Sequence, residues 1–218
     1  MLTGIDHVMN RVLQTLKEEG LADNTIVVYA ADNGYYMGDR GFAGKWSHHE
    51  QSLRVPLVIY DPRLPEELRG RTVDTTALNL DLPPTFLDWA GVPVPASYQG
   101  ASLKPMIEGV PKPKGWREDF FCEHSNRRYA ISRLGVCGQR FKYARYVDQE
   151  PVFEYLHDLQ NAPNELINLA GNEQHRSLLK KMRQRTDALA EDYAKALTAT
   201  VSPSRKPGNR DAIQRIHQ

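Results

Sequence analysis

Asp32 and Asn33 are adjacent oxygen-bearing residues that precede Gly34. A carboxylate and a carboxamide are hard donors, suited to Ca²⁺ or Mg²⁺ rather than to zinc or copper. Such ions take about six to eight oxygens, so this pair would supply only part of a coordination shell. Asp-Asn-Gly is also ordinary turn chemistry, because Asn and Asp bond their own backbone and Gly accepts positive φ. The tripeptide by itself leaves both interpretations open.

Lys45 lies in a glycine-rich loop that spans residues 34–53 and also holds His48 and His49. Glycine lets the backbone approach a ligand closely, and lysine supplies a compact positive charge for a sulfate or phosphate oxygen. The alternative for a loop lysine is a solvated charge. The two histidines suit acid–base chemistry or zinc binding, but adjacent histidines lack the spacing of a zinc site. The sequence therefore does not predict a zinc site in this loop.

Two predicted strands position these residues. Residues 25–30, Thr-Ile-Val-Val-Tyr-Ala, and residues 56–60, Pro-Leu-Val-Ile-Tyr, favour buried strands. In open α/β sheets ligands collect at the carboxyl ends of the strands, which is where Asp32 and Asn33 would lie. An amphipathic helix over residues 5–16, ended by Gly20, precedes the first strand.

The remaining chain predicts a second, smaller region. Asp81 is a plausible N-cap for a helix that Gly91 ends. A proline- and lysine-rich stretch near residue 115 then separates residues 1–115 from residues 116–200. The latter contain four short strand-like runs, which predict an antiparallel sheet, and a long amphipathic helix from about His175. One run, residues 140–146, alternates basic and aromatic residues, as expected of a half-exposed strand. Residues 201–218 are predicted to be a disordered tail.

Composition excludes some classes of function. The 218-residue chain has a formal net charge of +1, which argues against a dedicated nucleic-acid surface. No run approaches the roughly 18 apolar residues of a membrane helix. The first residues show neither the basic nor the apolar region of a signal peptide. Two cysteines, Cys122 and Cys137, could pair or stay free, and they do not determine the redox compartment.

Residues 21–45 and 50–59 closely resemble the C-terminal half of the sulfatase family, within the alkaline-phosphatase-like superfamily. The resemblance is carried by Asp-Asn-Gly at residues 32–34, Gly-Lys at 44–45 and Arg-Val-Pro at 54–56. It implies that Asp32 and Asn33 bind the active-site calcium, with Mg²⁺ less favoured. It also implies that Lys45 contacts the sulfate group as a catalytic and substrate-binding residue. The implied fold class is α/β: the C-terminal part of an alkaline-phosphatase-like sheet flanked by helices, plus a small four-stranded antiparallel sheet packed by a long C-terminal helix.

The resemblance continues in residues 79–103 and 156–170, with departures. His157 replaces the usual tyrosine and Ala162 the usual aspartate, and Gly-Val-Cys-Gly at 135–138 stands where many relatives have Gly-Val-Arg-Thr. His124 lies where some sulfatases carry a substrate-facing histidine, and a histidine without catalytic duty is the alternative. These departures weaken any inference about which sulfated substrate is held.

The family's formylglycine nucleophile has no match in these residues. Neither Cys122 nor Cys137 begins a Cys-x-Pro-Ser-Arg motif, and the family's N-terminal Asp-Asp metal pair is not found. Residues 201–205 of the tail, Val-Ser-Pro-Ser-Arg, are similar to this motif, but Val201 holds the position of its first residue and offers no nucleophile. We therefore expect the chain to be the C-terminal part of a sulfatase, a fragment with little or no turnover by itself.

The expected function is that of a sulfuric ester hydrolase of the arylsulfatase type. The resemblance implies a sulfated small molecule or glycan as partner, and a periplasmic, secreted or lysosomal-like location; neither a nucleic acid nor a membrane is expected. In the family, a formylglycine hydrate attacks sulfur while calcium and the lysine stabilise charge on the sulfate oxygens. A phosphonate or phosphodiester hydrolase of the same superfamily and a non-enzymatic binding module are the alternatives.

Overall fold

The structure, a computed structural model, describes residues 2–126 and 131–200 of the chain. The chain divides into two compact units: Met1–Lys45 with Glu50–Pro113, and Trp46–His49 with Lys114–Gln218. The predicted boundary at residue 115 lies close to Pro113. The segment Trp46–His49, predicted as part of the first region, belongs to the second unit. The predicted tail, including Val201, lies outside the described residues.

The first unit contains short strands and mostly short helices. Its strands are β1 (Val27–Ala30), β2 (Tyr36–Met37), β3 (Ala43–Gly44) and β4 (Leu57–Tyr60). Its α-helices are α1 (Leu2–Glu18), α2 (Glu50–Leu53), α3 (Leu82–Trp89) and α4 (Lys104–Ile107). Four 3-10 turns complete it: η1 (Ala22–Asn24), η2 (Asp39–Gly41), η3 (Glu66–Leu68) and η4 (Asn79–Asp81).

Strands β1 and β4 pair antiparallel, with Val27 opposite Tyr60. Both predicted strands are present, but the prediction that they are buried is wrong. Residues of β1 are half-buried or exposed, and Val58 and Tyr60 of β4 are exposed. The reason is that, within the described residues, this sheet contains only two strands. A two-stranded ladder lacks the neighbouring strands that would cover its faces and edges.

Helix α1 forms as predicted, but its apolar face is exposed: Val8 is 62% exposed, and Val12 is exposed as well. Gly20 ends the helix in the left-handed conformation, with φ +66°. Its amide donates to the carbonyl of Lys17 at 3.2 Å, and the amide of Leu21 donates to Leu16 at 2.8 Å. This pair of bonds is the Schellman ending, in which glycine accepts the positive φ without steric cost.

Asp81 acts differently from the predicted N-cap of α3. It makes no side-chain hydrogen bond to the start of that helix. Its Oδ2 instead accepts from the amide of Leu78 at 2.8 Å, and its Oδ1 accepts from the amide of Ala101 at 2.9 Å. The fully buried carboxylate therefore ties η4 to the chain that precedes α4.

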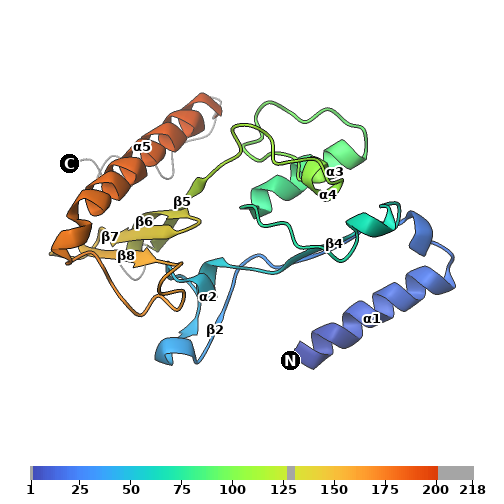
Figure 1. Cartoon of the computed structure of the whole chain (residues 1–218), viewed down its shortest axis with the longest axis horizontal. Coiled ribbons are helices and arrows are strands. Elements are labelled where there is room, and N and C mark those ends of the chain that lie inside the picture. The colour runs from blue at the N-terminus through green and yellow to red at the C-terminus, as the bar shows by residue number, and fades with distance from the viewer. Residues whose placement is uncertain (1, 127–130, 201–218) are drawn as a thin grey trace. The chain divides into compact units, whose positions relative to one another are not determined.

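The second unit is a four-stranded antiparallel sheet with one long helix. The strands follow one another in chain order: β5 (Asp119–Asn126), β6 (Ile131–Gly138), β7 (Phe141–Tyr146) and β8 (Phe153–Asp158). The turn η5 (Glu173–His175) leads into α5 (Arg176–Thr200). Figure 1 shows α5 lying along the sheet of this unit. The predicted sheet and helix are thus both present.

The core of the second unit lies between the sheet and α5. One buried residue from each of three strands meets the buried Leu179 of α5 there: Val136 of β6, Tyr143 of β7 and Leu156 of β8. Met182 and Leu189 of α5 pack against this cluster. Alternate residues of each strand therefore face the helix, as the period of two requires.

The opposite face of the sheet is covered too. Lys142, on the face of β7 away from Tyr143, is fully buried, and its Nζ donates to Glu165 Oε1 at 2.9 Å. The prediction of a half-exposed strand with a solvated charged face is therefore wrong. The segment Trp46–His49 contacts this face, where His48 lies against Tyr146 and Tyr155.

Cys122 and Cys137 lie diagonally across β5 and β6. Their Sγ atoms are 3.7 Å apart, and the two cysteines are not joined by a disulfide. Among the described helices, none combines the length and the apolar character needed to span a bilayer.

Candidate functional site

Asp32 and Asn33 follow the end of β1, as predicted. Their backbone is held by Asn79 of η4, whose Nδ2 donates to the carbonyls of Ala31 at 3.1 Å and Asp32 at 3.3 Å. The Asp32 side chain is exposed and that of Asn33 half-buried. A solvent-facing carboxylate and a neighbouring carboxamide are thus fixed at one end of a strand.

Gly34 gives this turn its shape through a close approach of two backbones. A Cβ at this position would lie 2.1 Å from the carbonyl oxygen of Gln51. The Gly34 amide also donates to the carbonyl of Ser52 at 2.9 Å. The glycine is not in the left-handed conformation, so the need for glycine comes from packing against α2 and not from positive φ. Any side chain here would push the turn away from α2.

Lys45 is brought directly to the predicted metal ligands. Its Nζ donates to Asn33 Oδ1 at 2.6 Å, while Asn33 Nδ2 donates to the carbonyl of Gly34 at 2.8 Å. The hairpin of β2 and β3, in which Tyr36 pairs with Gly44, returns the chain to this point. The first unit therefore joins Asn33 and Lys45, which are 12 positions apart in the sequence, by one hydrogen bond.

The donors present fit a hard cation in part. Asp32 and Asn33 offer carboxylate and amide oxygens, which calcium and magnesium accept. In residues 2–126 and 131–200, Asp32 belongs to no group of three or more clustered histidine, cysteine or acidic ligand atoms. The pair thus supplies the chemistry of such a site but not a full coordination shell.

His124, the other predicted substrate-facing residue, belongs to the second unit. It lies within β5 and not after it, and its ring stacks on Trp46 with centroids 5.9 Å apart. Burial lowers the pKa of His124, and the charge of Arg133, its register partner on β6, lowers it further. Its Nε2 and the Nε and Nη1 of Arg133 are buried without a hydrogen-bond partner among the described residues.

The structural roles of two residues, Asn79 and His157, were not identified from the sequence. Asn79, which holds the turn at Asp32, was not among the predicted site residues, and nothing in the sequence links it to a position 47 residues earlier. His157 was noted only as a replacement for tyrosine, yet it lies with His48 and His49 in one buried cluster. The histidine at an aromatic position was the signal that could have joined the three.

The chain is similar to known proteins over most of its length. Residues 38–192 match the family model of the N-sulphoglucosamine sulphohydrolase C-terminal region. An N-acetylglucosamine-6-O-sulfatase of Bacteroides thetaiotaomicron is 33% identical over 198 residues, which cover 87% of this chain and 34% of the relative. The chain therefore spans about a third of the length of that relative.

Solved structures are similar over most of the chain. A structure in complex with its substrate D-glucosamine-2-N,6-O-disulfate has a TM-score of 0.79 and 29% identity, and the match covers 94% of this chain and 41% of that one. A phosphonate monoester hydrolase of Agrobacterium radiobacter has a TM-score of 0.77 and 29% identity, over 88% of this chain and 40% of that one. The chain belongs to the sulfatase family of the alkaline-phosphatase-like superfamily and corresponds to the C-terminal region of its members.

Proposed function

We propose that this chain carries the C-terminal part of the active site of a sulfuric ester hydrolase. The observation that supports the proposal most directly is the hydrogen bond from Lys45 Nζ to Asn33 Oδ1, at 2.6 Å. It places a cationic group beside the turn that holds the oxygen donors. A sulfate ester carries its negative charge on oxygens, so it suits a site in which a lysine and a cation lie side by side.

Each residue has a separate task in this proposal. Asp32 and Asn33 hold the cation, for which calcium is favoured, and Asn79 fixes the backbone that carries them. The bound ion would supply positive charge that stabilises the sulfate oxygens. Lys45 is exposed, so its ammonium group can exchange the Asn33 oxygen for a sulfate oxygen without being desolvated first. Lys45 would then contact the substrate directly.

The cation half of the proposal is tested with calcium chloride alone. Nuclear magnetic resonance spectra of the chelator-treated chain would be followed as calcium is added to concentrations on the order of millimolar, the range of weak calcium modules. We expect shifts of the amide signals of residues 31–34. Asp32→Asn should abolish them, whereas Asp23→Asn, at an exposed aspartate of η1, should keep them. Shifts that are equal in the two variants would overturn the assignment of Asp32.

The lysine half is tested with an aryl sulfate as the probe. Lys45→Met should weaken binding of the probe by about tenfold, because a hydrogen bond to a charged group contributes roughly 1.5 kcal/mol or more. Lys17→Met removes an exposed lysine of α1 and serves as the matched control. We expect little or no turnover, since neither cysteine begins the nucleophile motif. Robust calcium-dependent hydrolysis by the purified chain would contradict this expectation.

We further propose a sulfated sugar as the substrate class. The support is that one relative is an N-acetylglucosamine-6-O-sulfatase, and one similar structure holds a disulfated glucosamine. A binding panel of glucosamine sulfates against a simple aryl sulfate tests this. Equal affinity for sulfated and unsulfated sugars would contradict it.

A phosphonate monoester hydrolase is the second candidate. The observation that favours it is the TM-score of 0.77 with such an enzyme, close to the 0.79 found with the disulfated glucosamine complex. Paired aryl sulfate and aryl phosphonate probes separate the two candidates. A non-enzymatic binding module would instead show thermal unfolding that ignores both calcium and sulfate.

A further inference from the structure

Three histidines from distant parts of the chain meet on the face of the sheet away from α5. His48 and His49 come from the segment Trp46–His49, and His157 comes from β8. Their exposed fractions are 3%, 9% and 2%. The rings of His48 and His49 have centroids 4.0 Å apart, and those of His48 and His157 are nearly parallel, with centroids 5.2 Å apart. Such a gathering of imidazoles in a buried place needs a chemical reason.

The ring nitrogens lie at the spacing of metal ligands. Each histidine offers one nitrogen, and the three nitrogens lie within 4.8 Å of one another. The Nε2 atoms of His48 and His157 are 3.0 Å apart. In a tetrahedral zinc site with Zn–N distances of about 2.0–2.1 Å, neighbouring ligand nitrogens lie about 3.3 Å apart. Small movements of these side chains would therefore place an ion among them.

The second nitrogen of each ring is near an oxygen, as is usual for histidines that bind metals. His157 Nδ1 lies 3.0 Å from the carbonyl oxygen of Ile167. A carbonyl can only accept, so Nδ1 carries the proton, and the neutral ring presents a lone pair at Nε2. His48 Nδ1 lies 3.0 Å from the hydroxyl of Tyr146, and His49 Nδ1 lies 3.3 Å from Ser47 Oγ. Each of the three rings is thus held through its Nδ1 atom, which leaves Nε2 for an ion.

Charge and burial favour the ligand form of these rings. Burial lowers the pKa of His48 strongly, and the neighbouring His49, His157, Lys142 and Arg133 lower it further. His48 is therefore neutral at physiological pH and able to donate a lone pair. The positive charge of Lys142 opposes a bound cation, but Glu165 at 2.9 Å offsets that charge. Arg133 remains as an unfavourable charge, which nitrogen ligation must outweigh.

We propose that His48, His49 and His157 bind one transition-metal ion of the zinc class. Nitrogen donors select such ions over calcium, which requires oxygens. The ion would tie the segment Trp46–His49 to strand β8, across 109 positions of sequence. Since the three side chains are almost fully buried, we expect a structural role for the ion, and the fourth position of a tetrahedral shell would fall to a water or another small ligand. It is separate from the oxygen donors Asp32 and Asn33 and does not depend on the proposed function.

When no ion is bound, one hydrogen bond joins two of the three rings, His48 and His157. His48 Nε2–H then donates to His157 Nε2, and His48 Nδ1 accepts from Tyr146. Binding an ion requires that this proton move to Nδ1 of His48, which then donates to the Tyr146 hydroxyl. No net proton leaves the ring in this exchange. The two states therefore differ in the tautomer of His48, which nitrogen NMR reports directly.

The test uses the full chain, stripped of metal by a chelator, with zinc or cobalt as the only additive. We expect calorimetry to give one zinc ion per chain, and the thermal unfolding midpoint to rise with zinc concentration. Cobalt should give the visible absorption of a low-coordinate nitrogen site, and calcium at millimolar concentration should not displace it. If the unsubstituted chain binds no zinc, or gives no such cobalt spectrum, that result by itself would overturn the proposal.

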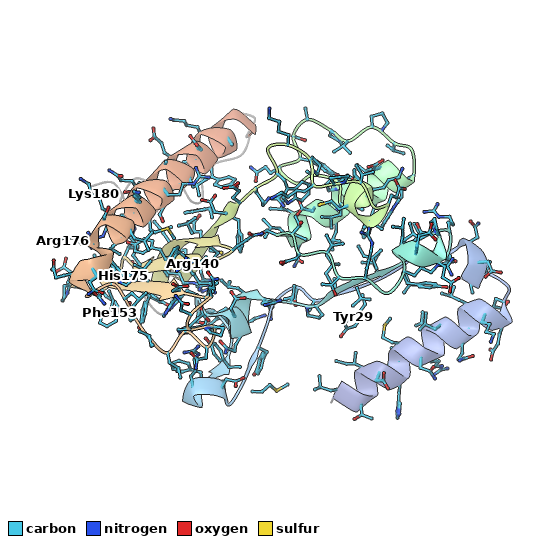
Figure 2. All side chains as sticks on the ribbon, in the orientation of Figure 1. Tyr29, Arg140, Phe153, His175, Arg176 and Lys180 are labelled. Atoms are coloured by element: carbon cyan, nitrogen blue, oxygen red, sulfur yellow. The ribbon has the colours of Figure 1, made fainter. Side chains whose placement is uncertain are left out.

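Variants locate the site. His157→Gln keeps a donor and an acceptor in place of the imidazole, and His49→Gln removes a different ligand. Each should weaken zinc binding by at least about 100-fold, because losing a direct ligand costs more than losing an outer-shell partner, which already costs roughly 10- to 100-fold. His175→Gln is the matched control, because His175, labelled in Figure 2, lies just before α5 and is not part of the cluster. Unchanged zinc affinity in His49→Gln, or an equal loss in His175→Gln, would assign the ion elsewhere and refute the proposal.

Discussion

The two units differ in how completely they bury their apolar residues. The second unit encloses a core between its sheet and α5, in which Val136, Tyr143 and Leu156 are fully buried. The first unit leaves the apolar face of α1 and much of β4 exposed. Both regions have clear amphipathic patterns in the sequence. The difference teaches that a pattern specifies an element and its apolar face, whereas burial depends on a second element to cover that face.

The largest expected difference between the two units comes from truncating one leucine in each of them. Leu156→Ala should destabilise the second unit by about 3 kcal/mol, because it leaves a cavity in a filled core. Leu13→Ala, on the exposed face of α1, should change stability by less than about 0.5 kcal/mol. Urea unfolding of the two variants measures both values. Equal losses would show that α1 is covered in solution and would remove the contrast.

A comparable effect is expected from the buried ion pair of the second unit. Lys142→Met leaves the Glu165 carboxylate buried without its cation, which costs about 3 kcal/mol. Lys195→Met removes the same group from an exposed pair with Glu191 on α5, where solvent screens the charges and the expected loss of stability is much smaller. Adding Glu165→Gln to Lys142→Met should restore part of the loss. A Lys142→Met protein as stable as the unmodified chain would show that the pair is solvated.

Acid should lower the stability of the second unit by protonating Glu154. A hydrogen-bonded ion pair with Arg183 lowers the pKa of this carboxyl from its ordinary value of 4.5. A lowered folded-state pKa gives stability that is present above pH 4.5 and is lost as the pH falls below that value. Glu154→Gln should therefore be less stable at neutral pH and show a shallower decline in acid. Identical pH profiles for the two proteins would contradict this.

The smallest change in stability is expected on α1. Replacing Val8 and Val12 by Gln should leave the free energy of unfolding within about 0.5 kcal/mol, because both side chains are exposed. The same change should reduce the fluorescence of a dye that binds apolar surface. Unaltered dye binding would show that the dye binds another apolar surface, for example the exposed residues of β4.

The local elements were largely predictable from the sequence. The four strands of the second unit and α5 follow from alternation and helical spacing, and Gly20 ends α1 as expected. The turn at Asp32 and the loop around Lys45 were located from turn chemistry and family resemblance. The hydrogen bond from Lys45 to Asn33 was not predicted, because it depends on how the hairpin of β2 and β3 folds back.

Predictions of burial and of distant contacts were the weaker ones. Lys142 looked like a surface charge because its partner, Glu165, lies 23 positions later in a loop with no pairing signal. The strands β1 and β4 looked buried because apolar residues do not reveal how many strands their sheet contains. His48 and His49 were not linked to His157 in the prediction, because spacing rules cover residues close in sequence and the third imidazole comes from β8.

The chain passes between the two units three times. The chain leaves the first unit after Lys45, enters it again at Glu50, and leaves once more after Pro113. The units are therefore joined by three covalent connections and not by one linker. A single proteolytic cut beyond Pro113 would not release either unit, since the peptide bonds on both sides of Trp46–His49 still hold them together. Expression of residues 114–200 by themselves would yield a sheet that lacks one of its covering segments.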